Sequence, residues 1–226
     1  MTKEQTHWDL VHPPGLLGAP ISDLRDVEPG DLALCGYFCD NLGGGPAGAR
    51  FLARQIRYFS EAAGPLERVH DLGDLNVFPL EPEKHEAAIC EQLDKIAAAG
   101  CIPILVGGDG SGLSILSRHV AERFGRDPIV QRPELPDARR DKDAPAVFAL
   151  DLSNWPGSQM EGVGASRRFD DLLARVGNVS EQTVGGAIFG LAPSLDWGGA
   201  VETRLARDLL SAVVGRLQKG DTNANS

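Results

Sequence analysis

The chain has few cysteines, few aromatic residues and fewer basic than acidic residues, and the shortage of positive charge excludes a class of partner. Four cysteines and no CxxC pair indicate buried, reduced thiols, with a redox pair of Cys35 and Cys39 as the alternative. Only 6% of the residues are aromatic. Lys and Arg number 22 against 32 Asp and Glu, which gives a net charge of −10, and no basic stripe stands out. Nucleic acid is therefore not an expected partner, because phosphate binding needs clustered positive charge.

Long hydrophobic runs are also missing. No apolar stretch approaches the roughly 20 residues that a membrane-spanning helix needs. The first residues, MTKEQTHWDL, are polar and charged, unlike a secretory signal. We therefore expect no membrane partner and a cytoplasmic protein. No serine or cysteine lies in a nucleophile elbow, so nothing favours acyl transfer.

The chain does contain a repeated alternation of strand-like and helix-like segments. Apolar runs predict strands at residues 32–38, 67–72, 102–106, 146–152 and 184–192. Helical periodicity predicts helices at residues 47–63, 83–99, 113–124 and 201–217. This order predicts a three-layer α/β/α fold with a mainly parallel central sheet.

The other segments differ in composition. Residues 125–145 are rich in proline and charge, which predicts an exposed loop. We expect residues 1–30 to be an N-terminal extension, 31–218 the α/β domain and 219–226 a disordered polar tail.

Polar residues follow several of the predicted strands, and ligands bind at the carboxyl ends of parallel strands. The candidate ligand-binding residues are Asp40, Asn41, Asp74, Asp109, Ser111, Asp151, Ser153 and Asn154. We expect Asp109 and Asp151 at the same edge of the sheet. These groups could bind a cationic or amide-bearing small molecule. The alternative is that they satisfy loop backbone groups and cap helices, Ser111 especially. His70 either reaches this site or is a hydrogen-bonded core histidine.

Five motifs occur in a recognisable order. They are GYFCD with GGGPAGAR at 36–50, DLGD at 71–74, PILVGGD at 103–109, FALDLS at 148–153 and APSLD at 192–196. In this order they resemble the ureohydrolase family of arginase, agmatinase and formimidoylglutamase over residues 30–217. The resemblance implies an arginase-like fold and hydrolysis of C–N bonds by a hydroxide held between two manganese ions.

The same resemblance marks what this chain lacks. The family holds its manganese with six ligands: a His after Gly-Gly-Asp, an Asp-x-His-x-Asp segment and an Asp-x-Asp pair. Here Gly110 and Ser153 replace two of them, and no Asp-x-His-x-Asp spacing occurs. Asp151 is then the only retained ligand, and Gly190 stands where the family has a Glu that grips the guanidinium.

A second alignment of the same strand stays open. Asp151 could begin the Asp-x-His-x-Asp segment, with Ser153 and Trp155 at its other two positions, which also leaves one ligand. In the preferred alignment, the segment 125–145 stands where the metal-binding strand is deleted. Either way, one carboxylate cannot hold two metal ions, so we expect no cofactor.

Three functions remain open. The first is a shortened, diverged, metal-deficient ureohydrolase, a pseudoenzyme that acts as a small-molecule-binding, regulatory or scaffold subunit. The second is a hydrolase acting on C–N bonds of a linear amidine or guanidine compound. The third is an unrelated α/β small-molecule binder whose resemblance is accidental.

Self-association is also expected. The family implies a homo-oligomer, or a hetero-oligomer with a relative. A wide apolar face of the last helix would support it unless that face packs on the sheet. This face consists of Leu205, Leu209, Leu210, Val213, Val214 and Leu217.

Overall fold

The protein contains a central sheet in which every paired strand is parallel, as the alternation predicts. The computed structural model describes residues 15–60, 66–133, 144–153, 163–180, 182–193 and 201–223. The strand order is β2-β1-β3-β6-β5-β4. The strands are β1 (Leu32–Gly36), β2 (Val69–Asp74), β3 (Ile102–Val106), β4 (Ile129–Gln131), β5 (Ala146–Asp151) and β6 (Thr183–Phe189).

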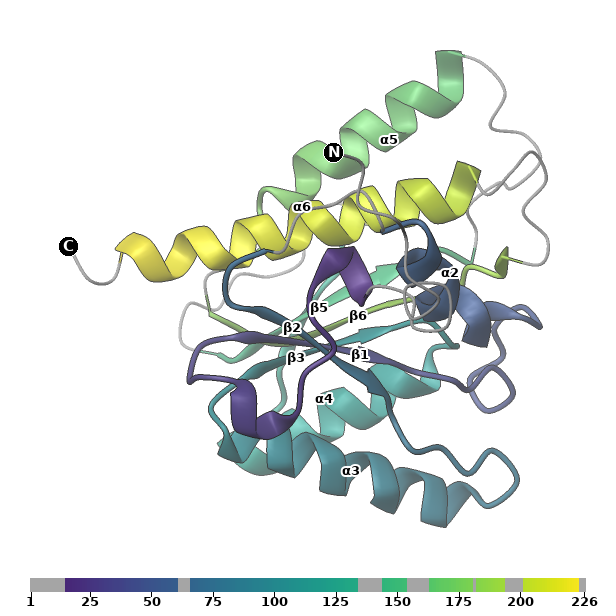
Figure 1. Ribbon diagram of the computed structural model, residues 1–226. Helices are drawn as coiled ribbons and strands as arrows, with labels where there is room; N and C mark the ends of the chain where they lie inside the picture. Colours follow the sequence, from purple (N-terminus) through teal and green to yellow (C-terminus); the bar gives the residue numbers. More distant parts are fainter. Residues whose placement is uncertain are drawn as a thin grey trace, which may run out of the picture.

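Helices cover both faces of this sheet, which completes the predicted three layers (Figure 1). One face is covered by α3 (Pro82–Ala98) and α4 (Ser111–Phe124). The other is covered by α2 (Leu52–Tyr58), α5 (Val163–Val176) and α6 (Val201–Asn223). No helix in the part of the chain that the structure describes is long and apolar enough to cross a membrane.

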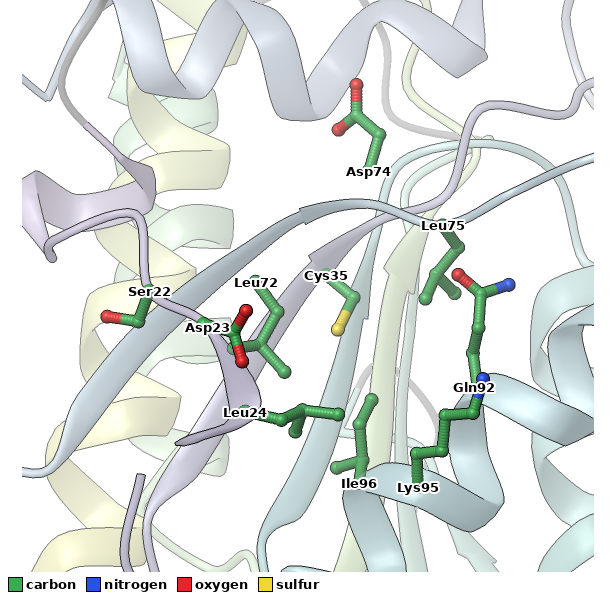
Figure 2. A pocket seen from close by; sticks show the side chains of 10 residues that line it. All are labelled: Ser22, Asp23, Leu24, Cys35, Leu72, Asp74, Leu75, Gln92, Lys95 and Ile96. Carbon is green, nitrogen blue, oxygen red and sulfur yellow. The ribbon is translucent and has the colours of Figure 1, made fainter. Parts of the chain in front are cut away.

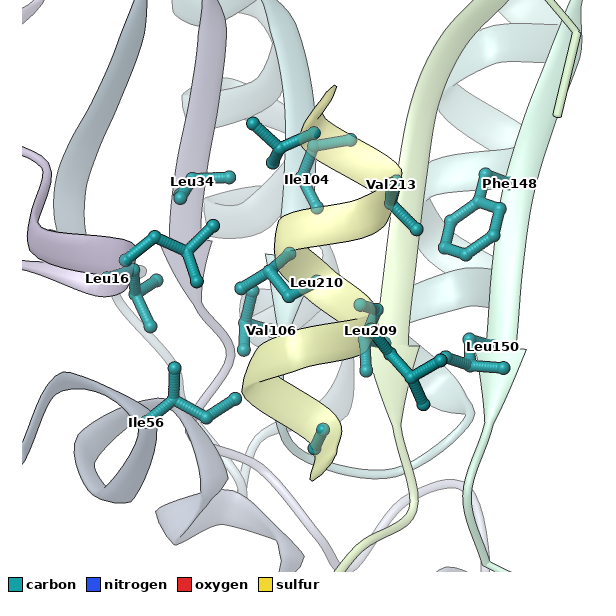
Figure 3. Packing of buried hydrophobic residues seen from close by; sticks show 14 of the residues in the cluster. Leu16, Leu34, Ile56, Ile104, Val106, Phe148, Leu150, Leu209, Leu210 and Val213 are labelled. Carbon is teal, nitrogen blue, oxygen red and sulfur yellow. The ribbon is translucent and has the colours of Figure 1, made fainter. Parts of the chain in front are cut away.

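The apolar face of α6 packs on the sheet. Leu209, Leu210 and Val213 are fully buried in this single chain. They share one hydrophobic cluster with Ile104 and Phe148 of the sheet (Figure 3). This burial removes the face as an argument for self-association, which stays a prediction on the family resemblance alone.

Several elements differ from the sequence prediction. The helix predicted over residues 47–63 is a 3-10 helix, η3 (Ala49–Phe51), followed by α2, which ends at Tyr58. Strand β4 lies within residues 125–145, where a loop was expected, and pairs with β5. Helix α5 was not predicted, because the predicted elements left residues 153–183 unassigned. Helix α6 continues to Asn223, past the predicted end at residue 217 and into the expected disordered tail.

The described part of the predicted N-terminal extension is built into the domain. The short 3-10 helix η1 (Leu16–Gly18) buries Leu16 and Leu17 in the core. The backbone N–H of Leu16 donates to Asp71 Oδ2 at 2.7 Å, and Ile21 forms a parallel bridge with Asp71. Residues 15–22 thus cover the outer edge of β2.

Candidate functional site at the carboxyl edge of the sheet

The two carboxylates predicted to share an edge do so. Asp109 follows the carboxyl end of β3, and Asp151 is the last residue of β5. Strand β6 lies between β3 and β5 and ends at Phe189. One intervening strand separates β3 and β5 by about 10 Å. The turn after β3 touches this strand directly, because the N–H of Gly190 donates to the Gly108 carbonyl.

A glycine turn carries the chain from β3 into α4. Gly107 and Gly108 have φ angles of +94° and +72°, which residues other than glycine rarely adopt. A Cβ on Gly108 would lie 2.4 Å from the Tyr37 ring and 2.5 Å from the Cys39 carbonyl oxygen. The turn is therefore pressed against the segment that follows β1.

The carboxylate of Asp109 is buried and fully hydrogen-bonded. Its Oδ2 accepts from the backbone N–H groups of Leu42 at 2.9 Å and Gly43 at 2.7 Å. Its Oδ1 accepts from the N–H of Ser111 at 3.0 Å and from the Ser111 hydroxyl. Asp109 is 1% exposed. Asp109 and Ser111 thus hold the glycine-rich loop in place. This is the alternative in which the candidate residues satisfy loop backbone groups.

The candidates on the loop after β1 are also engaged in local contacts. Asp40 Oδ2 accepts from the Gly48 N–H at 2.6 Å, and its Oδ1 pairs with Arg50 at 3.4 Å. Asn41 Nδ2 donates to the Pro79 carbonyl at 3.3 Å. These contacts hold loops together and leave no convergent set of free groups.

Asp74 belongs to a buried ionic cluster on β2. Arg57 donates to Asp74 Oδ1 at 2.5 Å and to both carboxylate oxygens of Asp71, at 2.7 and 3.0 Å. Burial opposes the charge on Arg57, but these two carboxylates hold its pKa above the usual value. This cluster joins α2 to β2 and, through Asp71, to the segment at Leu16.

Asp151, which the motif resemblance implies is the one retained metal ligand, faces a cation. Its Oδ1 accepts from the Ser153 N–H at 2.9 Å, and its Oδ2 lies 4.0 Å from Arg132 Nη1. A Cβ on Gly190, where φ is +85°, would lie 2.9 Å from Asp151 Oδ1 and 2.7 Å from Ser153 N. A glutamate at position 190 would therefore not fit this backbone. Asn154 lies outside the described residues.

Sequence reasoning missed Arg132, because it missed β4. Arg132 directly follows Gln131, the last residue of that strand, so it reaches the same edge as Asp151. The apolar pair Ile129-Val130 was the available signal, but it is short and lies among prolines and charges. Sequence reasoning also missed Tyr37 and His85. These two side chains are hydrogen-bonded to each other and, through Ser111, to Asp109.

His70 and the cysteines lie in structural settings. His70 Nε2 is 3.0 Å from Asp31 Oδ2, and His70 Nδ1 is 3.1 Å from Ser22 Oγ, so its ring is engaged away from the carboxyl edge. All four cysteines are unpaired. Burial raises the pKa of both Cys35 and Cys39, which argues against the redox-pair alternative.

The described residues at this edge do not fit a manganese centre. Manganese needs several oxygen or imidazole donors. Gly110 offers none, the oxygens of Asp109 are taken by N–H and O–H donors, and Asp151 faces a guanidinium. Across the described ranges, no three His, Cys, Asp or Glu side chains lie close enough together to hold a metal ion.

A separate depression of about 250 Å³ lies between α3, β1, β2 and the 3-10 helix η2 (Leu24–Asp26) (Figure 2). The lining around Cys35 is apolar. Asp74 is the one candidate residue in this lining, and its carboxylate points away from the other lining side chains. The charged groups at its rim are already paired, Asp23 with Arg25 and Lys95 with Glu91. Nothing in this lining selects a ligand.

Comparison with known proteins supports the family resemblance that the motifs indicate. Residues 30–131 match the sequence model of the arginase family. This segment, a little under half of the chain, is thus similar to the arginase family. The chain is 33% identical over 106 residues to mitochondrial guanidino acid hydrolase of Homo sapiens, covering 42% of this chain and 30% of that protein. It is 34% identical over 106 residues to mitochondrial agmatinase of Gallus gallus, covering 42% and 31%. The match thus spans about a third of these relatives.

The arginase-like fold extends beyond the matched segment. Proclavaminate amidino hydrolase from Streptomyces clavuligerus superposes with a TM-score of 0.71 at 18% identity, covering 92% of this chain and 98% of that one. Formimidoylglutamase from Bacillus subtilis gives 0.70 at 16% identity, covering 97% and 96%. The shared fold and the matched segment together disfavour an accidental resemblance.

Proposed function

We propose that this arginase-like protein is a metal-deficient ureohydrolase relative that binds a small molecule and acts as a regulatory or scaffold subunit. The observation that carries the proposal is the Arg132–Asp151 pair. A guanidinium beside the one retained carboxylate supplies the positive charge that a metal ion would supply in the family. It also repels any divalent ion that approaches the same carboxylate.

The rest of the edge supports the proposal. Asp109 already accepts four hydrogen bonds, so binding a metal there would release the glycine loop. Gly190 has no room for the glutamate that the family uses to grip a guanidinium. The missing metal donors and the missing substrate contact therefore both favour a protein without ureohydrolase activity.

The alternative is a hydrolase acting on C–N bonds of a linear amidine or guanidine compound. The curated relatives favour it, because they are named guanidino acid hydrolase and agmatinase. For this chain, the alternative needs donors from another subunit. We therefore include self-association in the proposal, as a homo-oligomer or as a hetero-oligomer with a relative. We also propose that the protein is cytoplasmic.

Urea release from arginine and agmatine, with manganese added, tests the choice between the two functions. We expect none above a blank, and we expect the double variant Gly110→His with Ser153→Asp to remain inactive. Two restored side chains leave the Asp-x-His-x-Asp segment missing and Arg132 in place. Urea release proportional to protein concentration would support the hydrolase instead.

A further inference from the structure

A buried row of side chains connects α3 to the turn before α4. His85 Nε2 lies 2.8 Å from Tyr37 Oη, and Tyr37 Oη lies 2.6 Å from Ser111 Oγ. The Ser111 hydroxyl then contacts Asp109 Oδ1. Tyr37, His85 and Asp109 are each 1% exposed. A polar network this deeply buried is stable only when each member is hydrogen-bonded.

One backbone contact sets the direction of every hydrogen bond in this row. The N–H of Phe78 donates to His85 Nδ1 at 3.1 Å, so Nδ1 is the unprotonated acceptor. Nε2 then carries the ring proton and donates to the Tyr37 oxygen. The Tyr37 hydroxyl donates to Ser111, and the Ser111 hydroxyl donates to the Asp109 carboxylate. The closed network therefore requires a neutral His85.

The two ends of the row hold two neighbouring loops. His85 holds the segment 75–81, which follows β2, through the Phe78 N–H. Asp109 holds Leu42 and Gly43 of the loop after β1. The loops are joined by the bond from Asn41 to the Pro79 carbonyl. Leu80, at the tip of the segment, is 91% exposed, whereas Leu75 at its start is buried in the core. Only the part of the segment around Phe78 and Leu80 is therefore free to move.

We propose that His85 is a proton-sensitive latch whose protonation at Nδ1 releases the part of the segment 75–81 around Phe78 from the carboxyl edge of the sheet. A protonated Nδ1 can no longer accept the Phe78 N–H, and the two N–H groups then face each other. The segment must move away for the new proton to find an acceptor or water. The latch is independent of the proposed function, because none of its contacts involves Asp151 or Arg132.

Burial outweighs the charges around the ring and decides the direction of the response. Burial lowers the pKa of His85, while the negative charges of Asp109 and Glu86 act in the opposite direction. Tyr37 is neutral here, because burial raises the pKa of its hydroxyl. On the other side of the contact, Lys84 lies over the Phe78 ring at 4.1 Å, but its charge is paired with Glu81. Glu86 is likewise paired with Arg118 of α4. The closed form therefore disfavours the proton relative to an open form, whose histidine pKa is about 6.5.

Hydrogen exchange of the Phe78 amide tests the latch in the intact chain. The opening equilibrium should rise by up to tenfold for each pH unit below about 6.5. Between pH 7.5 and pH 5.5 we expect exchange, corrected for the intrinsic rate, to increase about tenfold. The variant His85→Asn keeps a side-chain acceptor without titrating in this range, so its Phe78 exchange should not depend on pH.

His119 provides the matched control. It is another buried histidine whose pKa is lowered by burial. It lies on α4, with its Nδ1 3.6 Å from Asp94 Oδ1, and takes no part in the row of hydrogen bonds that holds Phe78. His119→Asn should leave the Phe78 response unchanged. A wild-type response that is absent, or one that persists in His85→Asn, would overturn the proposal.

Nitrogen NMR of the His85 ring in the wild-type protein keeps the test decisive if His85→Asn fails to fold. We expect Nε2–H with unprotonated Nδ1 at pH 7.5, and exchange of Phe78 that follows the titration of this ring. A ring protonated at Nδ1 when neutral would contradict the latch.

Discussion

Gly110 and Gly190 are two glycines that stand where the ureohydrolase resemblance implies a side chain, but their backbones differ. Gly110 has an ordinary helical conformation, with φ −65° and ψ −7°, and a Cβ there would meet only Phe189 at 3.6 Å. Gly190 has φ +85° and a crowded Cβ position. The sequence shows the same letter at both sites. Only the backbone shows that a side chain fits at position 110 and not at position 190.

Alanine substitution should separate these two glycines. Gly110→Ala should raise the free energy of unfolding by about 0.4–1 kcal/mol, because it restricts the unfolded chain without strain in the folded one. Gly190→Ala should lower it by more than about 1 kcal/mol, because an L residue is strained at positive φ. Urea denaturation measures both. A stabilising Gly190→Ala would mean that the turn beside Asp151 is built differently.

At the scale of elements, the sequence predicted what depends on local pattern and missed what depends on distant partners. Strand β3 was predicted at its observed bounds, because its apolar run is bounded by glycines. Strand β4 has three residues and is defined by pairing with β5, which a local pattern does not reveal. The segment 15–22 likewise depends on Asp71, about 50 residues further along the chain.

Leu16 tests whether that N-terminal segment contributes to the fold. Leu16 is fully buried against the core, so Leu16→Ala should lower the free energy of unfolding by about 2–5 kcal/mol. Leu80→Ala is the control, because Leu80 is 91% exposed and should change stability by less than about 0.5 kcal/mol. Chemical denaturation of both variants gives the comparison. Equal, small effects would show that residues 15–22 are not part of the cooperative core.

At the scale of the whole molecule, the parallel sheet places the described candidate residues at one edge, as the sequence predicts. The sequence offered hydrogen bonding to loop backbone as one alternative for them, but it did not identify their partners. Asp109 is saturated by N–H groups from a loop more than 60 residues away, and Asp151 is paired with an arginine on a strand that was not predicted. A list of missing ligands indicated a weak metal site. The geometry adds that the remaining carboxylates already have other partners.

The manganese content of the purified protein tests the proposed loss of the metal centre most directly. The chain would be equilibrated with excess manganese, freed of unbound ion by gel filtration and analysed by mass spectrometry of the metal. Since the loss of even one supporting contact costs metal sites about tenfold or more in affinity, we expect less than about 0.1 manganese ion per chain. The variant Arg132→Ala should remain equally low, because other donors are still missing. About one or two tightly bound manganese ions per wild-type chain, the content of a filled site, would contradict the account.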